Sequence, residues 1–340
     1  MAGIEGRSAP PWPRRALGAV LVMGGLYGLG ALLEGVLIEY AQRIVLLAGI
    51  NAILAVGLNL INGTTGQFSI GHAGFMAVGA YGAAFFGTQL RPFFGASALG
   101  GVLTFNLALL IGASLAGLAG FCVGMPSLRL KGDYLAVVTL GFGEIIRILF
   151  NNAQFLGAAT GYFGNDPSGL PAYTNFFWVY LWAVLIVLLV VNLTFSQTGR
   201  SLLAIREDEI AAEAMAIPTT RLKVLAFTVS AAAAGIAGGL FAYMQSGIRP
   251  EDFKFEKSID MIVMIIVGGL GSISGAILGG VFVAVTLELM RDLAQYRLVL
   301  YALLLIVIML VRPQGLLGSR ELPALFAVLR KRNLKGKART

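Results

Sequence analysis

Long apolar runs recur through the whole chain, and they constrain its fold more than any other feature. The runs at 176–195 and 298–311 carry apolar residues on all sides of a helix. Such helices have to be covered by lipid or by other helices. Of the 340 residues, 57% are hydrophobic and only 12% are charged. The sequence therefore predicts an all-α, polytopic integral membrane protein built as a helical bundle.

The runs and the polar residues between them predict about ten membrane spans, with about eight as the alternative. The expected spans are 16–34, 42–61, 70–88, 99–124, 133–150, 176–195, 223–245, 259–272, 274–290 and 297–312. The run that holds the eighth and ninth spans has two interpretations. It forms either one long tilted helix or two shorter segments broken at Gly268–Ser274. The 45 glycines suit a membrane bundle, because small residues let helices approach closely.

Basic residues indicate the orientation of the chain in the membrane. With ten spans and a cytoplasmic N-terminus, most of the 25 Lys and Arg residues fall on the cytoplasmic side, as the positive-inside tendency requires. Nine spans would place the basic tail outside. We expect a cytoplasmic N-terminal segment at 1–15, a transmembrane domain at 16–318 with a large cytoplasmic loop at about 196–222, and a basic cytoplasmic tail at 319–340.

Several function classes find no support in the sequence. One cysteine and one histidine leave no internal disulfide and argue against a metal cluster. A phosphate-binding P-loop is missing, because the only Lys-Ser or Lys-Thr pair, Lys257-Ser258, follows Glu256 instead of glycine. Hydrolase signatures are also missing. The net charge of +8 reflects orientation in the membrane, so we expect no nucleic acid, metal or cofactor on this chain.

The segment GRSLLAIREDEIAAEAMAI, Gly199–Ile217, is unusually charged for this chain. Its apolar residues recur at helical spacing, and its acids cluster toward the helix start, where they complement the helix dipole. We expect a short amphipathic helix from about Asp208 to Ile217 that is ended by Pro218. Its Ala211 and Ala212 would form a narrow outward face. Lipid is one candidate for covering the apolar face, but the acidic surroundings favour a protein partner.

Two glycine-interrupted stretches are candidates for a translocation pathway. The first, SIGHAGF, leads into the third span, and the second runs from Gly268 to Gly275. Broken membrane helices expose backbone polar groups where a substrate can bind. The candidate pathway residues, with one charged pair from the fifth span, are Ser69, Gly71, His72, Gly74, Glu144, Arg147, Gly268, Gly269, Gly271 and Ser272.

Three of these side chains have two interpretations each. His72 is either a helix-entry or packing residue, or a substrate ligand. Glu144 and Arg147 lie three residues apart on one helix face, where they either pair with each other or bind the charged ends of a zwitterionic cargo. Both roles keep the charges away from lipid, because charges inside the membrane are costly.

Six sequence blocks resemble the permease subunits of branched-chain amino-acid ABC importers, specifically the LivM type. They are the segment Gly199–Ile217, GQFSIGHAGFMAVGAYGAA from Gly66, KGDYLAVVTLGFGEIIRILFNN from Lys131, LKVLAFTVSAAAAGIAGGLFA from Leu222, IVGGLGSISGAILGG from Ile266 and RPQGLLG from Arg312. The blocks extend from Gly66 to Gly318 in the order of the family. The two ends of the chain carry no such signature.

The resemblance implies an inner-membrane subunit of bacteria that is surrounded by lipid and works by alternating access. The implied partners are a second, LivH-like permease, two ATP-binding subunits like LivG and LivF that hold ATP and Mg²⁺, and a periplasmic substrate-binding protein. The cytoplasmic loop would hold the coupling helix, which inserts into a groove of the ATPase. Its E-A-A pattern falls on Glu209, Ala211 and Ala212, while Ala216 replaces the family's glycine. We expect Ala216 to fit within the helix without strain.

The residues that the resemblance assigns to coupling are Gly199, Arg206, Glu207, Asp208, Glu209, Ala211, Ala212 and Ala216. The cargo stays open at this point. Relatives resembling this chain carry leucine, isoleucine and valine, and others carry urea, short amides or aromatic acids. An ATP-independent channel or secondary transporter is a rival interpretation, against which the acidic coupling-type helix argues. A membrane-embedded structural subunit with no pathway is a second rival.

Overall fold

The computed structural model describes most of the chain. The described residues are 23–30, 32–33, 35–94, 98–128, 130, 132–164, 170–171, 173–291, 296–312 and 314–318. The expected N-terminal segment and the basic tail lie outside them, as do residues 16–22, 31 and 34 of the first expected span and Arg129 and Lys131 of the expected cytoplasmic side.

Within the described residues, the regular structure is helical apart from one isolated bridge between Tyr162 and Ile248. The main helices are α2 (Glu39–Asn59), α3 (His72–Phe94), α4 (Ala98–Ser127), α5 (Asp133–Asn152), α6 (Phe176–Thr194), α7 (Gln197–Glu207), α8 (Glu209–Ala214), α9 (Thr219–Met244), α10 (Phe255–Gly268), α11 (Ile273–Leu289) and α12 (Arg297–Val311). The prediction of an all-α polytopic membrane protein is confirmed.

Four of the described helical segments are long and apolar enough to cross a membrane by length and composition: 39–64, 99–127, 176–194 and 219–244. The segment 39–64 adds a π-helical turn, Leu60–Thr64, to the end of α2. At 1.5 Å per residue, a 26-residue helix exceeds the roughly 30 Å of a bilayer core. The longest of these segments can therefore span a bilayer core from end to end.

The ambiguous run at 259–290 forms two helices. α10 has 14 residues and α11 has 17, and the backbone between them leaves the helical region at Gly269 and Gly271, where φ is +117° and +86°. The two helices pack against each other through Gly268, Gly275 and Gly279, where a β-carbon would collide with the facing backbone. The structure thus selects the two shorter segments.

The centre of the bundle is built on small residues of α9. Gly235 faces Gly79 of α3, and Gly238 faces the carbonyl of Met76 on the same helix, so that backbone meets backbone. Gly112 of α4 packs against both Gly79 and Gly235. Close approach of this kind stabilises membrane bundles through van der Waals contact, because lipid removes the hydrophobic drive between helices.

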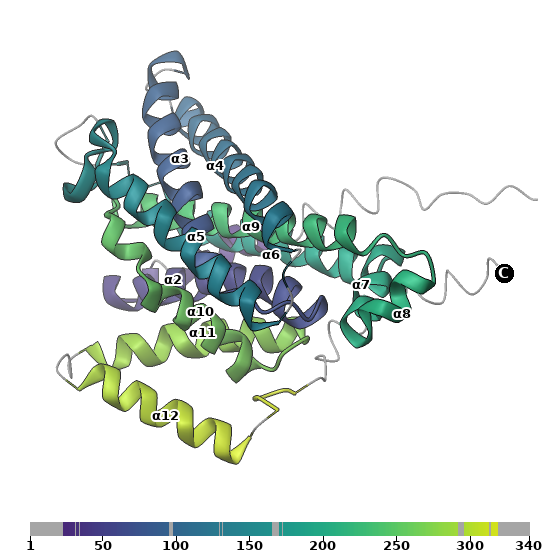
Figure 1. Ribbon diagram of the computed structural model, residues 1–340. Helices are drawn as coiled ribbons and strands as arrows, with labels where there is room; N and C mark the ends of the chain where they lie inside the picture. Colours follow the sequence, from purple (N-terminus) through teal and green to yellow (C-terminus); the bar gives the residue numbers. More distant parts are fainter. Residues whose placement is uncertain are drawn as a thin grey trace, which may run out of the picture.

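One end of the molecule carries α7 and α8, which project to the right of the other helices in Figure 1. We call it the α8 end. The π-helical turn, the α10–α11 break and residues 314–318 also lie there. Arg206 of α7 donates a hydrogen bond to the Gly63 carbonyl at 2.9 Å, and the Leu317 amide donates to the Gly268 carbonyl at 3.2 Å. The opposite end carries short 3-10 turns, including Gln154–Leu156 and Pro250–Phe253.

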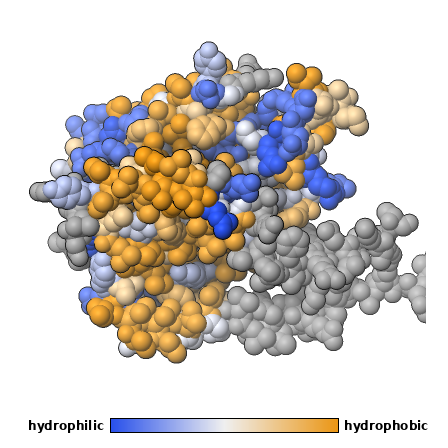
Figure 2. All heavy atoms as spheres, turned by 90° about the horizontal axis from the view of Figure 1, so that it is seen from below, coloured by the Kyte–Doolittle hydropathy of each residue, from blue (hydrophilic) through white to orange (hydrophobic). Residues whose placement is uncertain are grey.

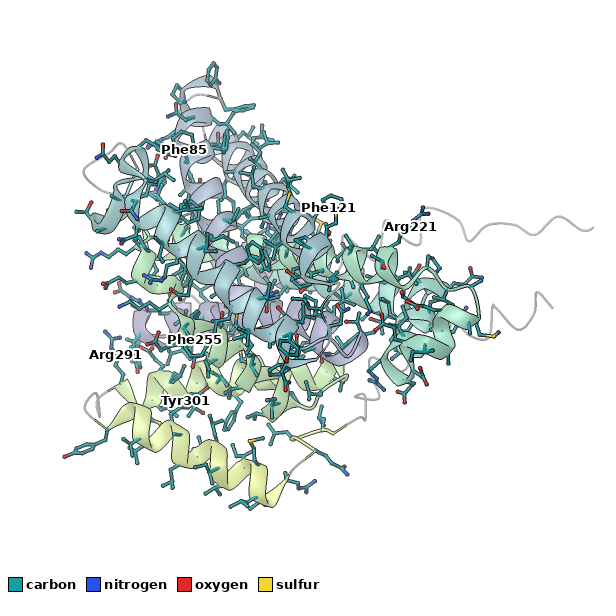
Figure 3. All side chains as sticks on the ribbon, viewed as in Figure 1. Phe85, Phe121, Arg221, Phe255, Arg291 and Tyr301 are labelled. Carbon is teal, nitrogen blue, oxygen red and sulfur yellow. The ribbon has the colours of Figure 1, made fainter. Side chains whose placement is uncertain are left out.

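The lateral surface is apolar, as a lipid-facing surface has to be. Figure 2 shows hydrophobic side chains across the middle of one face, with hydrophilic side chains toward its two sides. α12 contributes strongly to this surface, since Val299, Leu310 and Val311 are each at least two-thirds exposed. Its Tyr301 points instead toward the rest of the bundle and is buried (Figure 3).

Adding a methyl group at the centre of the bundle tests this packing. Gly79→Ala places a β-carbon against the backbone of Gly235, so the helices have to separate, and we expect a loss of about 1–3 kcal/mol of unfolding free energy. Gly141→Ala on α5 meets open space and is the matched control, with an expected gain of about 0.5–1 kcal/mol. Unfolding of the purified chain in detergent measures both. Equal effects of the two variants would contradict this account of the core.

Candidate functional site

The charged segment Gly199–Ile217 forms two helices instead of one. The Ser196 hydroxyl accepts a hydrogen bond from the Gly199 amide and begins α7. The Asp208 carboxylate then accepts hydrogen bonds from the amides of Ile210 and Ala211, at 2.9 and 3.0 Å, and begins α8. An aspartate at such a position satisfies amides that have no partner within the helix. Asp208 therefore separates the two helices.

The expected end of the second helix is wrong. α8 ends at Ala214, before Pro218, and Ala216 adopts φ +58° instead of continuing the helix. The Ile217 amide donates to the Ala212 carbonyl, and the Ala216 amide donates to the Glu213 carbonyl. These are the two bonds of a Schellman motif, in which glycine normally takes the left-handed position. The expectation that Ala216 fits within the helix without strain is therefore also wrong.

The outward face of α8 differs from the expected one. Ala212 is only 4% exposed, and it packs into the protein. Ala211 and Ala214 are exposed, as are Ile210 at 74% and Met215 at 78%. The expected pair of outward alanines is thus correct for Ala211 and wrong for Ala212. The face that a partner could reach is an apolar tip made of Ile210, Ala211, Ala214 and Met215.

Glu209 also faces its own chain. Its carboxylate lies 2.6 Å from the ammonium of Lys223 on α9, and the Lys223 side chain is only 7% exposed. A second bond joins the same helices, because the Thr219 hydroxyl donates to the Glu213 carboxylate at 2.8 Å. α8 is therefore attached to α9, the central helix of the bundle. Lys223 was not among the expected site residues, although a lone lysine beside a long apolar run was a usable signal.

Arg206 connects α7 to the rest of the α8 end. Its guanidinium donates to the Gly63 carbonyl at 2.9 Å and forms an ion pair with the exposed Glu207 at 2.8 Å. A β-carbon built on Gly271 would lie 3.3 Å from the same guanidinium, and one on Gly66 would collide with the Arg206 stem. One arginine thus contacts the π-helical turn at Gly63, the chain after it at Gly66 and the break between α10 and α11 at Gly271.

The α10–α11 break is held by polar side chains and by the C-terminal residues. Asn59 of α2 accepts from the Gly271 amide at 2.9 Å and donates to the Ser272 carbonyl at 3.2 Å. The Leu316 amide donates to the Val267 carbonyl at 2.7 Å. Gly268 is buried, and Gly269 packs against Gly318. The buried Ser272 hydroxyl accepts a hydrogen bond from the Gly275 amide and so begins α11. This break therefore lies at the α8 end.

The other broken stretch, residues 65–71, is not helical, and Gln67, Ser69 and Gly71 within it are buried. Asn62 forms two hydrogen bonds with the backbone of the fully buried Ser69, and Thr139 of α5 accepts from the Ile70 amide at 3.1 Å. Ser258 of α10 accepts from the Ala73 amide at 3.2 Å. Side chains of three helices thus satisfy backbone groups that lipid could not.

The glycines of this stretch let α3 approach α5. A β-carbon on Gly71 would collide with the Thr139 backbone, and one on Gly74 would lie 2.8 Å from the Cα of Gly143. Gly71, Gly74 and Glu144 line a small cleft of about 10 Å³ together with residues of α10. His72 points elsewhere. It is 1% exposed, lies near Gly57 and Phe75, and neither ring nitrogen has a hydrogen-bond partner in the described part of the chain.

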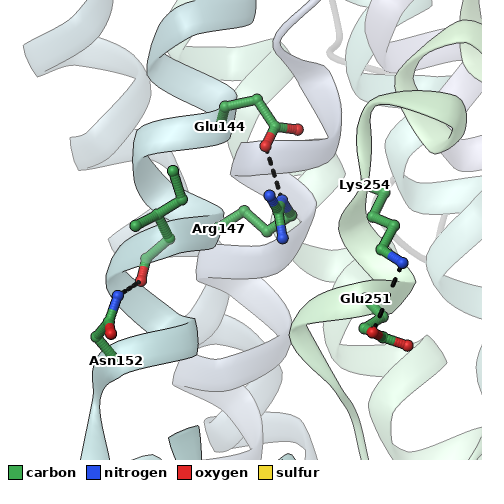
Figure 4. A network of polar contacts seen from close by, with 6 residues as sticks. Glu144, Arg147, Asn152, Glu251 and Lys254 are labelled. Carbon is green, nitrogen blue, oxygen red and sulfur yellow. Dashed lines mark hydrogen bonds and ion pairs between the residues drawn. The ribbon is translucent and has the colours of Figure 1, made fainter. Parts of the chain in front are cut away.

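Glu144 and Arg147 pair with each other. The Arg147 Nε lies 2.8 Å from the Glu144 carboxylate, and the side chains are 24% and 32% exposed for Arg147 and Glu144 (Figure 4). Their helix, α5, buries few residues and exposes large apolar side chains, including Val137 and Leu149. The pair does not meet the α10–α11 break. The structure thus separates the expected pathway residues into two groups, one along α3 and α5 and one at the α8 end.

The comparisons with known proteins agree with one another. A family model described as "Branched-chain amino acid transport system / permease component" matches residues 40–311. The high-affinity branched-chain amino acid transport system permease protein LivM of Salmonella typhimurium is 41% identical over 295 residues, which cover 78% of this chain and 67% of that protein. LivM of Escherichia coli is 40% identical over the same length and coverage. The permease protein LivH of Salmonella typhimurium is 29% identical over 175 residues, which cover 51% of this chain and 55% of LivH.

The Lys223–Glu209 pair is expected to stabilise the attachment of α8. In a double-mutant cycle with Lys223→Met and Glu209→Gln, we expect a coupling energy of about 1–3 kcal/mol, because Lys223 is almost fully buried. The exposed pair Lys254–Glu251, at 3.6 Å, is the control, with an expected coupling of about 0–1 kcal/mol. Unfolding in detergent measures both cycles. A coupling no larger than that of the control would show that the pair does not hold α8.

Replacing Ala216 should relieve its left-handed backbone. We expect Ala216→Gly to raise the unfolding free energy by about 0.5–1 kcal/mol, since the cost of a side chain there exceeds the entropy cost of glycine. Ala214→Gly, two residues earlier and inside α8, is the control and should lower it by about 1 kcal/mol. Thermal unfolding of the two variants gives the sign of each change. A destabilised Ala216→Gly variant would count against the Schellman assignment.

Proposed function

The chain belongs to the family of branched-chain amino acid transport permease components, and on this premise we propose that it is one of two permease subunits of an ATP-driven importer for branched-chain amino acids. The chain is a multi-pass protein of the bacterial inner membrane and a transport permease component, as its relatives are. The second subunit would resemble LivH, which also matches this chain. Both termini would lie in the cytoplasm, together with the α8 end.

The apolar tip of α8 is the observation that carries the proposal. Ile210 and Met215 are each about three-quarters exposed, at an end of the molecule where charged side chains surround them. Exposed apolar groups rimmed by polar ones mark a protein contact. Anionic lipid is a poor partner here, because Glu207, Asp208 and Glu213 carry the same sign of charge. This tip would insert into a groove of an ATP-binding subunit.

The attachment of α8 supports a role in transmission. The buried Lys223–Glu209 pair ties the tip to α9, and Arg206 ties α7 to the end of α2. Force applied to the tip would therefore reach the centre of the bundle instead of bending a free loop. Of the coupling residues, Asp208, Glu209, Ala211, Ala212 and Ala216 would move as one unit with α9, with Ala212 and Glu209 facing inward. Gly199, Arg206 and Glu207 belong to α7, which Arg206 holds against the end of α2.

The exposed face of α5 is the proposed side of the translocation pathway. Glu144 and Arg147 are partly exposed on this face, and charges that face lipid are costly. A second permease subunit covering α5 would remove them from lipid and would leave a polar path between the two subunits for alternating access. The cargo would be delivered by a periplasmic binding protein on the opposite side from α8.

ATP and Mg²⁺ would be bound by two separate ATP-binding subunits. The sequence of this chain has no P-loop, so the work it does in transport would be mechanical. The named cargo of the relatives favours branched-chain amino acids over urea, short amides or aromatic acids. An ATP-independent channel would have no use for an apolar tip that is held outside the bilayer by a buried ion pair.

A charge placed on the tip should detach the ATP-binding subunits. In the purified complex, we expect Ile210→Asp to lower the retention of these subunits by at least about tenfold, because losing an interface anchor costs roughly 2 kcal/mol or more. ATP-dependent leucine uptake into proteoliposomes should fall by a similar factor. Phe155→Asp is the matched control. Phe155 is 72% exposed and lies in a short turn at the opposite end, so this variant should keep its ATP-binding subunits.

Unchanged retention and uptake in Ile210→Asp would show that α8 does not dock onto an ATP-binding subunit. Uptake that persists without ATP, in liposomes that contain only the permease subunits, would favour the channel interpretation instead.

A further inference from the structure

The outer face of α5 carries a regular pattern of exposed residues. They recur every three or four positions along the helix, so they form one continuous stripe. We call it the α5 stripe, and its members are Tyr134, Val137, Gly141, Ile145, Ile148 and Asn152. Its four large apolar or aromatic side chains are each at least half exposed. Because only Leu135, Ala136 and Thr139 of this 20-residue helix are buried, the described part of the chain leaves a long face of α5 open.

A glycine stands in the middle of the α5 stripe. A β-carbon built on Gly141 meets no atom within 4 Å, so the packing of the described chain does not require a glycine there. Gly143, two residues later, faces inward and lies against Gly71. Glycine destabilises a helix relative to alanine, but in a membrane it lets two helices approach backbone to backbone. The bare backbone at Gly141 therefore suits a helix from outside this chain.

Charge beside the α5 stripe distinguishes it from a face that lipid covers. α4 also exposes a row of large side chains, which includes Leu103, Leu110 and Leu118, but none of the residues of α4 is charged. α5 carries Glu144 and Arg147 beside its stripe, and both side chains are partly exposed. Charges that face hydrocarbon are costly, and they are therefore usually covered by protein or by a polar cavity. We expect lipid on α4 and protein on α5.

The charged pair lies on one flank of the α5 stripe. At about 100° per residue, Glu144 is roughly 60° around the helix from Gly141, and Leu140 and Arg147 lie farther around on the same side. Leu140 and Glu144 also line the small cleft between α3, α5 and α10. A helix that packs on the stripe would therefore leave the charged pair and this cleft beside the contact.

We propose that a helix of the second permease subunit packs on the α5 stripe and makes its closest approach at Gly141. The inference rests on the proposed function, because it takes the occupant from an importer with two permease subunits. Val137 and Ile145 would contact the partner helix on either side of the crossing point. The cargo path would then run along the flank that holds Glu144 and Arg147, and the opposite flank of α5 would take no part in it.

A side chain added at the crossing point tests the proposal, because the isolated chain and the complex should respond differently. Gly141 has room for a side chain in the isolated chain, but in the complex that side chain would separate the two backbones. We expect Gly141→Leu to lower the retention of the second permease subunit during purification by at least about tenfold. Gly141→Ala should lower it less. Thermal unfolding of the isolated chain should show neither variant to be less stable than the parent.

Ser114→Leu is the matched control. Ser114 is exposed on α4, so this variant adds the same side chain to a face on which we expect lipid. It should retain the second permease subunit as the parent does. Parent-like retention in Gly141→Leu, or an equal loss in Ser114→Leu, would overturn the proposal.

Photo-crosslinking identifies what covers the α5 stripe and covers the case in which Gly141→Leu fails to fold. Ile148→benzoylphenylalanine is made in the whole complex, with Leu110→benzoylphenylalanine on α4 as its control, since both positions are about half exposed. We expect the Ile148 variant to form an adduct with the second permease subunit and the Leu110 variant to form adducts with lipid alone. Adducts of the Ile148 variant with lipid alone, or with a second copy of this chain, would overturn the proposal.

The proposal and the proposed function can fail separately. If the Ile148 variant crosslinks only to lipid while the parent complex holds two different permease subunits and takes up leucine with ATP, the α5 stripe faces lipid and the importer assignment stands. If the parent chain supports ATP-dependent uptake without a second permease subunit, the proposed function fails first and this inference fails with it.

Discussion

Backbone-to-backbone contact at glycine is the interaction on which the rest of the structure depends. α9 lies against α3 through Gly235 and Gly238 with no side chain between them. Because water and its hydrophobic drive are absent within a bilayer, this close packing is what makes α9 the centre of the bundle. The same helix carries Lys223 near its start, and Lys223 holds Glu209. The attachment of α8 is therefore only as firm as the glycine contacts behind it.

The broken segments follow from the other constraint of a bilayer, which is that buried backbone groups need partners. Short polar side chains on intact helices provide them: Asn62 and Thr139 for the chain before α3, and Asn59 for the loop between α10 and α11. These bonds let the chain leave the helical conformation inside the protein. They also explain the buried Asn59 and Asn62 at the end of α2 and in the π-helical turn that follows it, although a purely apolar segment would insert more readily.

The sequence predicted the helices well, because runs of apolar residues and their polar ends depend on local composition. It predicted the faces of short elements poorly. Which side of α8 points outward depends on the Lys223–Glu209 pair, and the spacing of six residues could not reveal that Ala212 faces inward. Nor could it reveal that Ala216 takes a left-handed conformation, since alanine is a strong helix former. The pairing of Glu144 with Arg147 was foreseen as one of two options, because their spacing of three residues permits it.

The contacts at the α8 end differ in how easily they could change. The Lys223–Glu209 pair is almost buried on the lysine side, and separating it would leave a charge without a partner, which is costly. Arg206, by contrast, pairs with its exposed neighbour Glu207 and otherwise meets backbone carbonyl and glycine surface around Gly63 and Gly271, and a guanidinium can shift among carbonyl oxygens at little cost. A displacement of α8 would therefore move α9 as one body while α7 slides against the two broken segments. Gly269 and Gly271, which already hold left-handed backbone angles, are the positions best able to absorb that sliding.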